Sequence, residues 1–202
     1  MTENDQMRLR DARNSFAGKA LTASQFDEVW AVSGILEREI RKTGTFREKL
    51  TDYAHAFARS EKFDQMKGET IIRDIYKSRY GQTMNQTREG LVERKEALGP
   101  DAKQEAFEYA QRVCDDVQSG ETMPFYQAFD RQALPLAQTF GITESGAKTL
   151  MKDAFQAAQG QDFYERGKAL EKEFHLPKRD AERSSRATER KPAPKRTQAR
   201  QP

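Results

Sequence analysis

Cysteine, histidine and long apolar runs are all scarce in this sequence of 202 residues. Cys114 is its one cysteine, which excludes an internal disulfide and, in a helical pattern, favours a small buried side chain. Residues 1–16 contain no apolar stretch of the kind found in a secretory signal. No run approaches the ~18 apolar residues that suggest a membrane span. We therefore predict a cytoplasmic protein that does not insert into a membrane.

Residues that commonly carry out catalysis or bind metals are also few. The two histidines are His55 and His175. Asp52 precedes His55 by three positions, a spacing that di-iron bundles use in two copies, but the sequence offers no second copy. No nucleotide-binding, hydrolase or zinc-protease motif occurs. We therefore predict no catalytic residues, no metal site, no cofactor and no enzymatic activity.

Charge, by contrast, is plentiful and unevenly distributed. Charged residues make up 33% of the chain and hydrophobic residues only 36%. Helices suit such a composition, because a helix needs only one apolar stripe to pack. Residues 177–202 contain nine Lys or Arg and three Asp or Glu, a net charge of +6. Residues 1–176 contain 26 basic and 29 acidic residues, a net charge of −3, so the basic character lies in the C-terminal tail.

Apolar residues recur at helical spacing along most of the chain, with capping residues between them. Ser24 with Asp27 opens a stripe that ends at Gly44, and Thr45 with Glu48 has the spacing of a capping box for the next helix. A further helix is predicted to end at Gly81. The helices predicted after it span residues 83–98, 100–120, 124–134, 143–158 and 162–174.

The order of these signals predicts the fold class. No segment alternates in polarity as a half-buried strand does, and Pro135 is expected to break or kink its helix. We predict an all-α fold, an irregular multi-helix bundle followed by a disordered basic tail that is too poor in apolar side chains to order itself. The predicted divisions are an N-terminal helical or partly disordered segment (1–20), a helical body (21–120), a second helical region (121–176) and the tail (177–202).

The helix predicted over residues 83–98 carries an apolar stripe at seven-residue spacing, formed by Met84, Leu91 and Leu98. Its other face is almost wholly polar. Such a stripe indicates a helix–helix contact, either inside the molecule or between two copies of the chain. A homo-oligomer that forms through residues 83–98 is therefore one of the expected assemblies.

Residues 136–150 contain an ordered series of small, turn-forming and apolar residues, namely Ala137, Gly141, Ile142, Ala147 and Leu150. The first of these allows two helices to cross closely, the glycine allows a tight turn, and Thr143 can cap the second helix. Residues 134–153 therefore resemble the helix-turn-helix of DNA-binding proteins.

The resemblance implies that the second helix of this segment faces DNA. The residues that it would present to the major groove or its phosphates are Ser145, Lys148, Thr149 and Lys152. Gly146 departs from the pattern, because glycine inside a helix costs about 1 kcal/mol relative to alanine. The alternative is an ordinary helical corner that packs within a bundle.

The C-terminal tail carries a series of cations, of which the candidate binding residues are Arg179, Arg183, Arg186, Arg190, Lys191, Lys195, Arg196 and Arg200. They suit a nucleic-acid arm that contacts phosphates, or a tail that recognises an acidic protein surface. The tail also resembles the arginine-rich C-terminal signals of type IV secretion substrates. A tail that only improves solubility is the remaining alternative.

Together these features predict a non-enzymatic, bacterial-type, DNA-associated protein that is regulatory or accessory to a nucleoprotein complex. The alternative is a protein-interaction module or a type IV secretion substrate whose arginine-rich tail is a recognition or export signal. DNA and a protein are therefore the expected partners.

Overall fold

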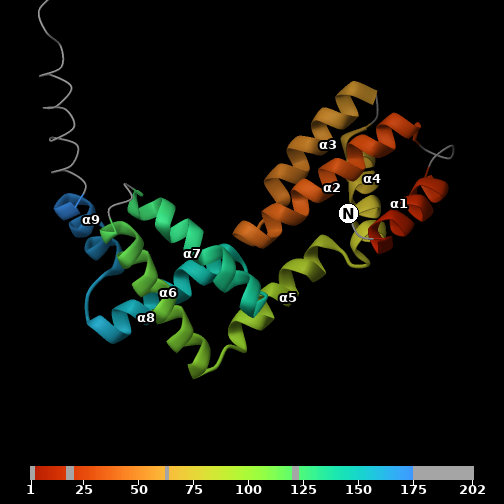
Figure 1. Ribbon diagram of the computed structural model, residues 1–202. Helices are drawn as coiled ribbons and strands as arrows, with labels where there is room; N and C mark the ends of the chain where they lie inside the picture. The colour runs from red at the N-terminus through yellow and green to blue at the C-terminus, as the bar shows by residue number, and fades with distance from the viewer. Residues whose placement is uncertain (1–2, 17–20, 62–63, 120–122, 175–202) are drawn as a thin grey trace, which may run out of the picture.

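The computed structural model describes residues 3–16, 21–61, 64–119 and 123–174, which form helices joined by short turns (Figure 1). No strand occurs in these residues, so the predicted all-α class is confirmed. None of the described helices is both long and apolar enough to cross a membrane. The predicted tail and His175 lie outside the described residues. The helices are α1 (Glu3–Phe16), α2 (Ala23–Thr43), α3 (Arg47–Glu61), α4 (Gln65–Tyr80), α5 (Met84–Glu96), α6 (Pro100–Gln118), α7 (Phe125–Phe140), α8 (Glu144–Gln159) and α9 (Phe163–Phe174).

Two hydrophobic cores, rather than one, organise these helices. The first core is formed by α1 to α5, and the second by α6 to α9. In Figure 1 the two groups lie on opposite sides of the molecule, with α5 running between them. Along the chain the change from one core to the other falls between α5 and α6, and the division predicted at residue 120 stays a prediction.

The apolar stripe of α5 is used inside the chain. Met84 and Leu91 are buried in the first core, and Leu98, just beyond the end of α5, packs against the second. The stripe thus contacts both cores along one helix. It is consequently covered in a single copy of the chain and does not itself favour a homo-oligomer.

Several predicted helix ends are confirmed. Gly44 and Gly81 close α2 and α4 with positive φ angles of 76° and 74°. Thr83 and Gln86 form the capping box of α5, and Pro100 opens α6. The caps of α2, α4 and α5 satisfy backbone groups that these helices leave unpaired, whereas Pro100 has no backbone N–H that would need a partner in the first turn of α6.

Two predicted starts are corrected by the structure. Ser24 lies inside the first turn of α2, and the cap is Thr22, whose hydroxyl accepts a hydrogen bond from the Gln25 N–H while the Gln25 side chain accepts one from the Thr22 N–H. Thr45 lies one position outside the cap of α3, and its N–H donates to the Thr43 hydroxyl at 3.1 Å. The same short polar side chains suit several neighbouring positions, so the sequence placed both starts wrongly.

Pro135 does not break its helix, so of the two expected outcomes, a break or a kink, the break is wrong. It lies inside α7, which continues to Phe140. Proline lacks an N–H and costs about 3 kcal/mol in a helix interior. On either side of it, Ala133, Leu136 and Ala137 are buried in the second core. Their burial offsets that cost and keeps the helix continuous.

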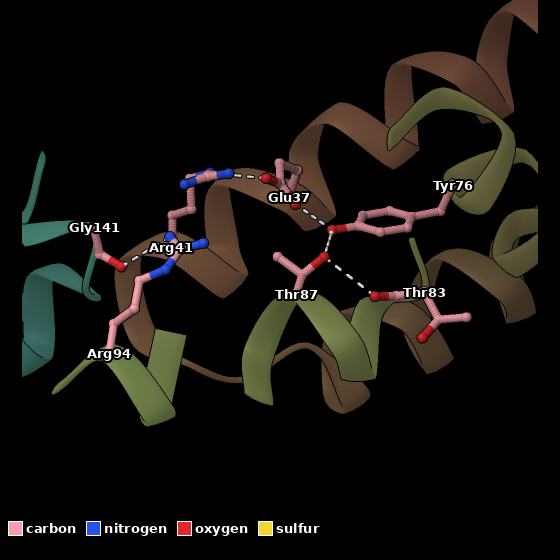
Figure 2. A network of polar contacts seen from close by, with 7 residues as sticks. All are labelled: Glu37, Arg41, Tyr76, Thr83, Thr87, Arg94 and Gly141. Carbon is pink, nitrogen blue, oxygen red and sulfur yellow. Dashed lines mark hydrogen bonds and ion pairs between the residues drawn. The ribbon is translucent and has the colours of Figure 1, made fainter. Parts of the chain in front are cut away.

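A buried polar network ties α2 to α4 and α5 (Figure 2). The Tyr76 hydroxyl donates to one carboxylate oxygen of Glu37, and the Tyr76 oxygen lies 3.0 Å from the Thr87 hydroxyl. Thr87 in turn lies 3.2 Å from the Thr83 carbonyl oxygen. The Arg41 Nε donates to the other Glu37 oxygen at 2.8 Å. Each oxygen of this buried carboxylate therefore has a partner.

The protonation state of Tyr76 suits this arrangement. Burial, and then the hydrogen bond to Glu37, raise the pKa of Tyr76 above its ordinary value. The hydroxyl therefore remains protonated at neutral pH and keeps donating to the carboxylate.

The second core contains a cluster of aromatic rings beneath a glycine of α9. The Phe125 ring lies 5.1 Å from that of Phe163 and 5.8 Å from that of Phe129, centroid to centroid. Gly167 is buried on α9, and a Cβ atom there would lie 2.3 Å from Cδ2 of Phe125. Glycine at this position therefore allows α9 to approach α7 closely.

Tyr76→Phe is expected to lower the free energy of unfolding by about 1–3 kcal/mol, because it leaves a buried carboxylate oxygen of Glu37 without a partner. Urea unfolding followed by circular dichroism measures this change. Tyr80→Phe is the matched control, since the Tyr80 hydroxyl has no hydrogen bond within the described residues and its ring is retained. Equal stability of the two variants would contradict the proposed role of the network.

Gly167→Ala is expected to destabilise the protein by about 1–3 kcal/mol, because the added methyl group overlaps the Phe125 ring. Gly90→Ala on α5 is the control, because a Cβ there meets nothing within 4 Å. Alanine at position 90 should stabilise the helix by about 0.5–1 kcal/mol. Thermal unfolding of both variants tests whether alanine lowers the stability at position 167 and raises it at position 90. A stabilising alanine at position 167 would refute the packing argument.

Candidate functional site

The segment that resembles a helix-turn-helix consists of α7, a three-residue turn and α8. Gly141 ends α7 with a φ angle of 62°, and the Ile142 N–H donates to the Ala137 carbonyl at 3.0 Å. The Thr143 hydroxyl accepts a hydrogen bond from the Gly146 N–H at 2.9 Å and caps α8. Helical corners in general share this turn geometry, so the DNA-binding resemblance stays a prediction.

Gly146 has a structural role inside α8. A Cβ atom at this position would lie 2.9 Å from the Thr143 hydroxyl oxygen and 3.3 Å from Cδ of Lys95, which belongs to the last turn of α5. Glycine therefore leaves room for the cap of α8 and for α5 at the same time. The sequence showed only the loss of helix propensity and not this close approach.

The four residues predicted to face DNA fall into two groups. Ser145 and Thr149 are exposed, one turn apart on α8. Lys148 forms an ion pair with Asp130 of α7, and the Lys152 ammonium lies 5.8 Å from the centroid of the Tyr164 ring on α9. The two cations therefore contact neighbouring helices, and the exposed pair offers hydroxyl groups without charge.

The surroundings of α8 also bear on its access to DNA. This helix packs against α2, α6, α7 and α9. Its first turn lies beside the α2–α3 turn, since a Cβ at Gly44 would lie 3.6 Å from Cγ2 of Thr143. A recognition helix normally enters the major groove with its N-terminal residues. Here that end of α8 is flanked by α2 and α5. The eight candidate tail residues, Arg179 to Arg200, lie outside the described residues.

An open pocket of about 640 Å³ lies where the two groups of helices meet, and we call it the junction pocket. Its lining comes mainly from α2 and α7, with contributions from α3, the α7–α8 turn and α8. The charged residues that line it are Arg38, Glu39, Arg41, Lys42, Lys49 and Glu144. The apolar side chains are Ile35, Leu134, Ala137 and Ile142.

Two of the four cations at the junction pocket are held by carboxylates. Arg41 is paired with Glu37, and Lys49 forms an ion pair with Glu39. The Lys49 hydrogen bond lowers the pKa of Glu39, and the same contact raises the pKa of Lys49. Both groups therefore stay charged at neutral pH. These pairs fix the positions of two cations on the pocket wall.

The other two cations are exposed and have no such partner. Arg38 and Lys42 lie four residues apart on α2, and neither side chain forms an ion pair or hydrogen bond with another described residue, although the charge of Lys42 contributes to the lowered pKa of Glu39. Leu134 on α7, which is 44% exposed, adds an apolar surface to the same pocket. The pocket thus combines unpaired positive charge with accessible apolar area.

A second open pocket, of about 690 Å³, lies between α6 and α8. Its lining is mostly apolar and includes Phe107, Leu150 and Ala157, with Lys103 as its one cation. It thus has one lining cation, where the junction pocket has four. The concentration of positive charge therefore distinguishes the junction pocket from this second pocket.

The groups that could carry covalent or metal chemistry are poorly placed for it. Burial raises the pKa of Cys114 to about 11, so its thiol is protonated at neutral pH and is a weak nucleophile. His55 and Asp52 are both exposed on α3. Within the described residues, no three His, Cys, Asp or Glu side chains gather as a metal site would require.

The sequence did not identify the junction pocket. It showed the charge run from Glu37 to Lys42, which is typical of a solvated helix face. The residues of α7 that line the same pocket lie almost one hundred residues further along the chain. A helical period places Arg38 and Lys42 on one face, but it cannot show that Leu134 lies beside them.

Comparison with known proteins adds no family to this description. No protein-family model matches the chain, and comparison with curated proteins and with solved structures gave no significant match.

Proposed function

We propose that this chain is a non-enzymatic protein-interaction module that binds a segment of a partner protein at the junction pocket. One observation carries the proposal, which is that exposed apolar surface at Leu134 adjoins two cations, Arg38 and Lys42, that have no ion pair in the described residues. Interfaces combine apolar anchors with arginine in this way. In this function the basic tail is a recognition or export signal for a separate partner.

The exposure of the cations favours a protein segment over a small ligand. Small-molecule sites bury most of the ligand and use a few convergent polar groups. Arg38 and Lys42 are exposed instead, and the pocket is open. A polypeptide can fill the apolar part of the pocket and still extend across these cations.

DNA association is the second candidate, as a regulatory protein or an accessory of a nucleoprotein complex. It is favoured by the exposed hydroxyl groups of Ser145 and Thr149 near the start of α8, and by the +6 charge of the tail. It ranks second because Lys148 and Lys152 contact neighbouring side chains, and because residues 1–176 carry a net charge of −3.

Selection from a displayed library of random peptides tests the proposed function. Peptides that bind the full-length protein should lose about tenfold or more in affinity on Leu134→Asp, because this change places charge on the apolar wall. Val92→Asp is the matched control, since Val92 is 46% exposed and lies outside the junction pocket. Failure to enrich any peptide, or equal binding to both variants, would refute the proposal.

Binding to duplex DNA across a salt series separates the two candidates. We expect the full-length protein to bind DNA only at low salt, through counterion release by the tail, and a chain ending at Leu176 not to bind. Lys148→Ala with Lys152→Ala should then have no effect. If the shortened chain still binds, and the exchange of Ser145 and Thr149 for aspartate abolishes that binding, DNA association becomes the first candidate.

A further inference from the structure

The chemistry of the junction pocket indicates the class of its occupant, on the assumption that the proposed function holds. Positive side chains outnumber carboxylates in the lining, by four to two. Because Lys49 neutralises Glu39 and Glu37 neutralises Arg41, the groups left to attract a ligand are Arg38, Lys42 and the Glu144 carboxylate. The remaining charge is positive on α2, and Glu144 at the start of α8 carries the one opposing charge.

The spacing of these cations fits a helix. Arg38 and Lys42 are four residues apart on α2, which corresponds to about 6 Å along the helix axis. Carboxylates four residues apart on a second helix have the same spacing. Ile35 lies one turn before Arg38, so apolar and cationic side chains follow one another along the wall of α2.

The size of the junction pocket agrees with this match. A helical turn with its side chains is about 10 Å wide and 5.4 Å long, a volume of about 400 Å³. The pocket of about 640 Å³ therefore has the volume of one to two such turns. The remainder of such a helix would lie over the exposed cations.

We propose that the occupant is an acidic amphipathic helix of another protein, whose apolar side chains contact Ile35 and Leu134 while its carboxylates pair with Arg38 and Lys42. This is a helix-in-groove mode of recognition, in which charge guides the encounter and apolar anchors hold the complex. The basic tail of this chain is excluded as the occupant by its charge, since the pocket cations repel it.

Two synthetic helical peptides provide the test. Both carry leucines at helical spacing, and they differ only in having glutamate or lysine at the flanking positions. Fluorescence anisotropy measures their binding to the full-length protein and to Arg38→Glu/Lys42→Glu. We expect the glutamate peptide to bind the wild type and to lose about tenfold or more in affinity for the Arg38→Glu/Lys42→Glu variant. This variant should bind the lysine peptide more tightly than the wild type does.

The control variant is Lys103→Glu/Lys168→Glu, which changes the net charge equally outside the junction pocket. All four positions are exposed, and circular dichroism verifies that both variants fold. Because the tail is intact in each, attraction of the glutamate peptide to the tail alone would leave the two variants with equal affinity for it. That result, or equal binding of both peptides to the wild type, would overturn the proposal.

The outcomes also separate this inference from the proposed function. Binding of the library peptides could weaken on Leu134→Asp while binding of the glutamate peptide is unchanged on Arg38→Glu/Lys42→Glu. In that case the pocket would bind an apolar protein segment but not an acidic helix. If neither Leu134→Asp nor Arg38→Glu/Lys42→Glu weakens peptide binding, the protein-binding function itself would be refuted.

Discussion

The carboxylate of Glu37 links the packing of the first core to the surface of the junction pocket. One of its oxygens accepts a hydrogen bond from buried Tyr76 on α4, and the other accepts one from Arg41 at the pocket. Through Thr87 the same network reaches α5, which leads to the second core. A buried carboxylate is costly unless both oxygens are paired. The network therefore holds α2 against α4 and α5, and α2 carries three of the four cations that line the junction pocket.

The two cores explain why an open pocket exists at their junction. A chain with only 36% hydrophobic residues has little apolar area to bury, and its helices place that area in two separate clusters. Where the clusters meet, polar and charged side chains prevail, so the helices do not close completely. A small residue allows the helices to approach each other there, since Gly146 of α8 leaves room for Lys95 in the last turn of α5.

Local sequence signals predicted the helices well where the signal acts within one turn. The capping box at Thr83 and the glycines at positions 44 and 81 stand where the sequence placed them. The break that the sequence allowed at Pro135 does not occur, because burial of the neighbouring residues offsets the local cost of the proline. The sequence was wrong at Ser24, where Thr22, two positions earlier, forms the reciprocal bonds.

The sequence by itself determined the all-α class, most helix ends and the separation of a basic tail from an acidic body, because these follow from composition and from contacts within a few residues. Only the tertiary structure decided which other residues each helix face contacts. It placed Lys148 against Asp130, packed Met84 and Leu91 into the first core and Leu98 against the second, and brought Leu134 beside Arg38 and Lys42. The physical reason is that a helical period fixes which residues share a face, whereas the packing of two cores fixes what that face contacts.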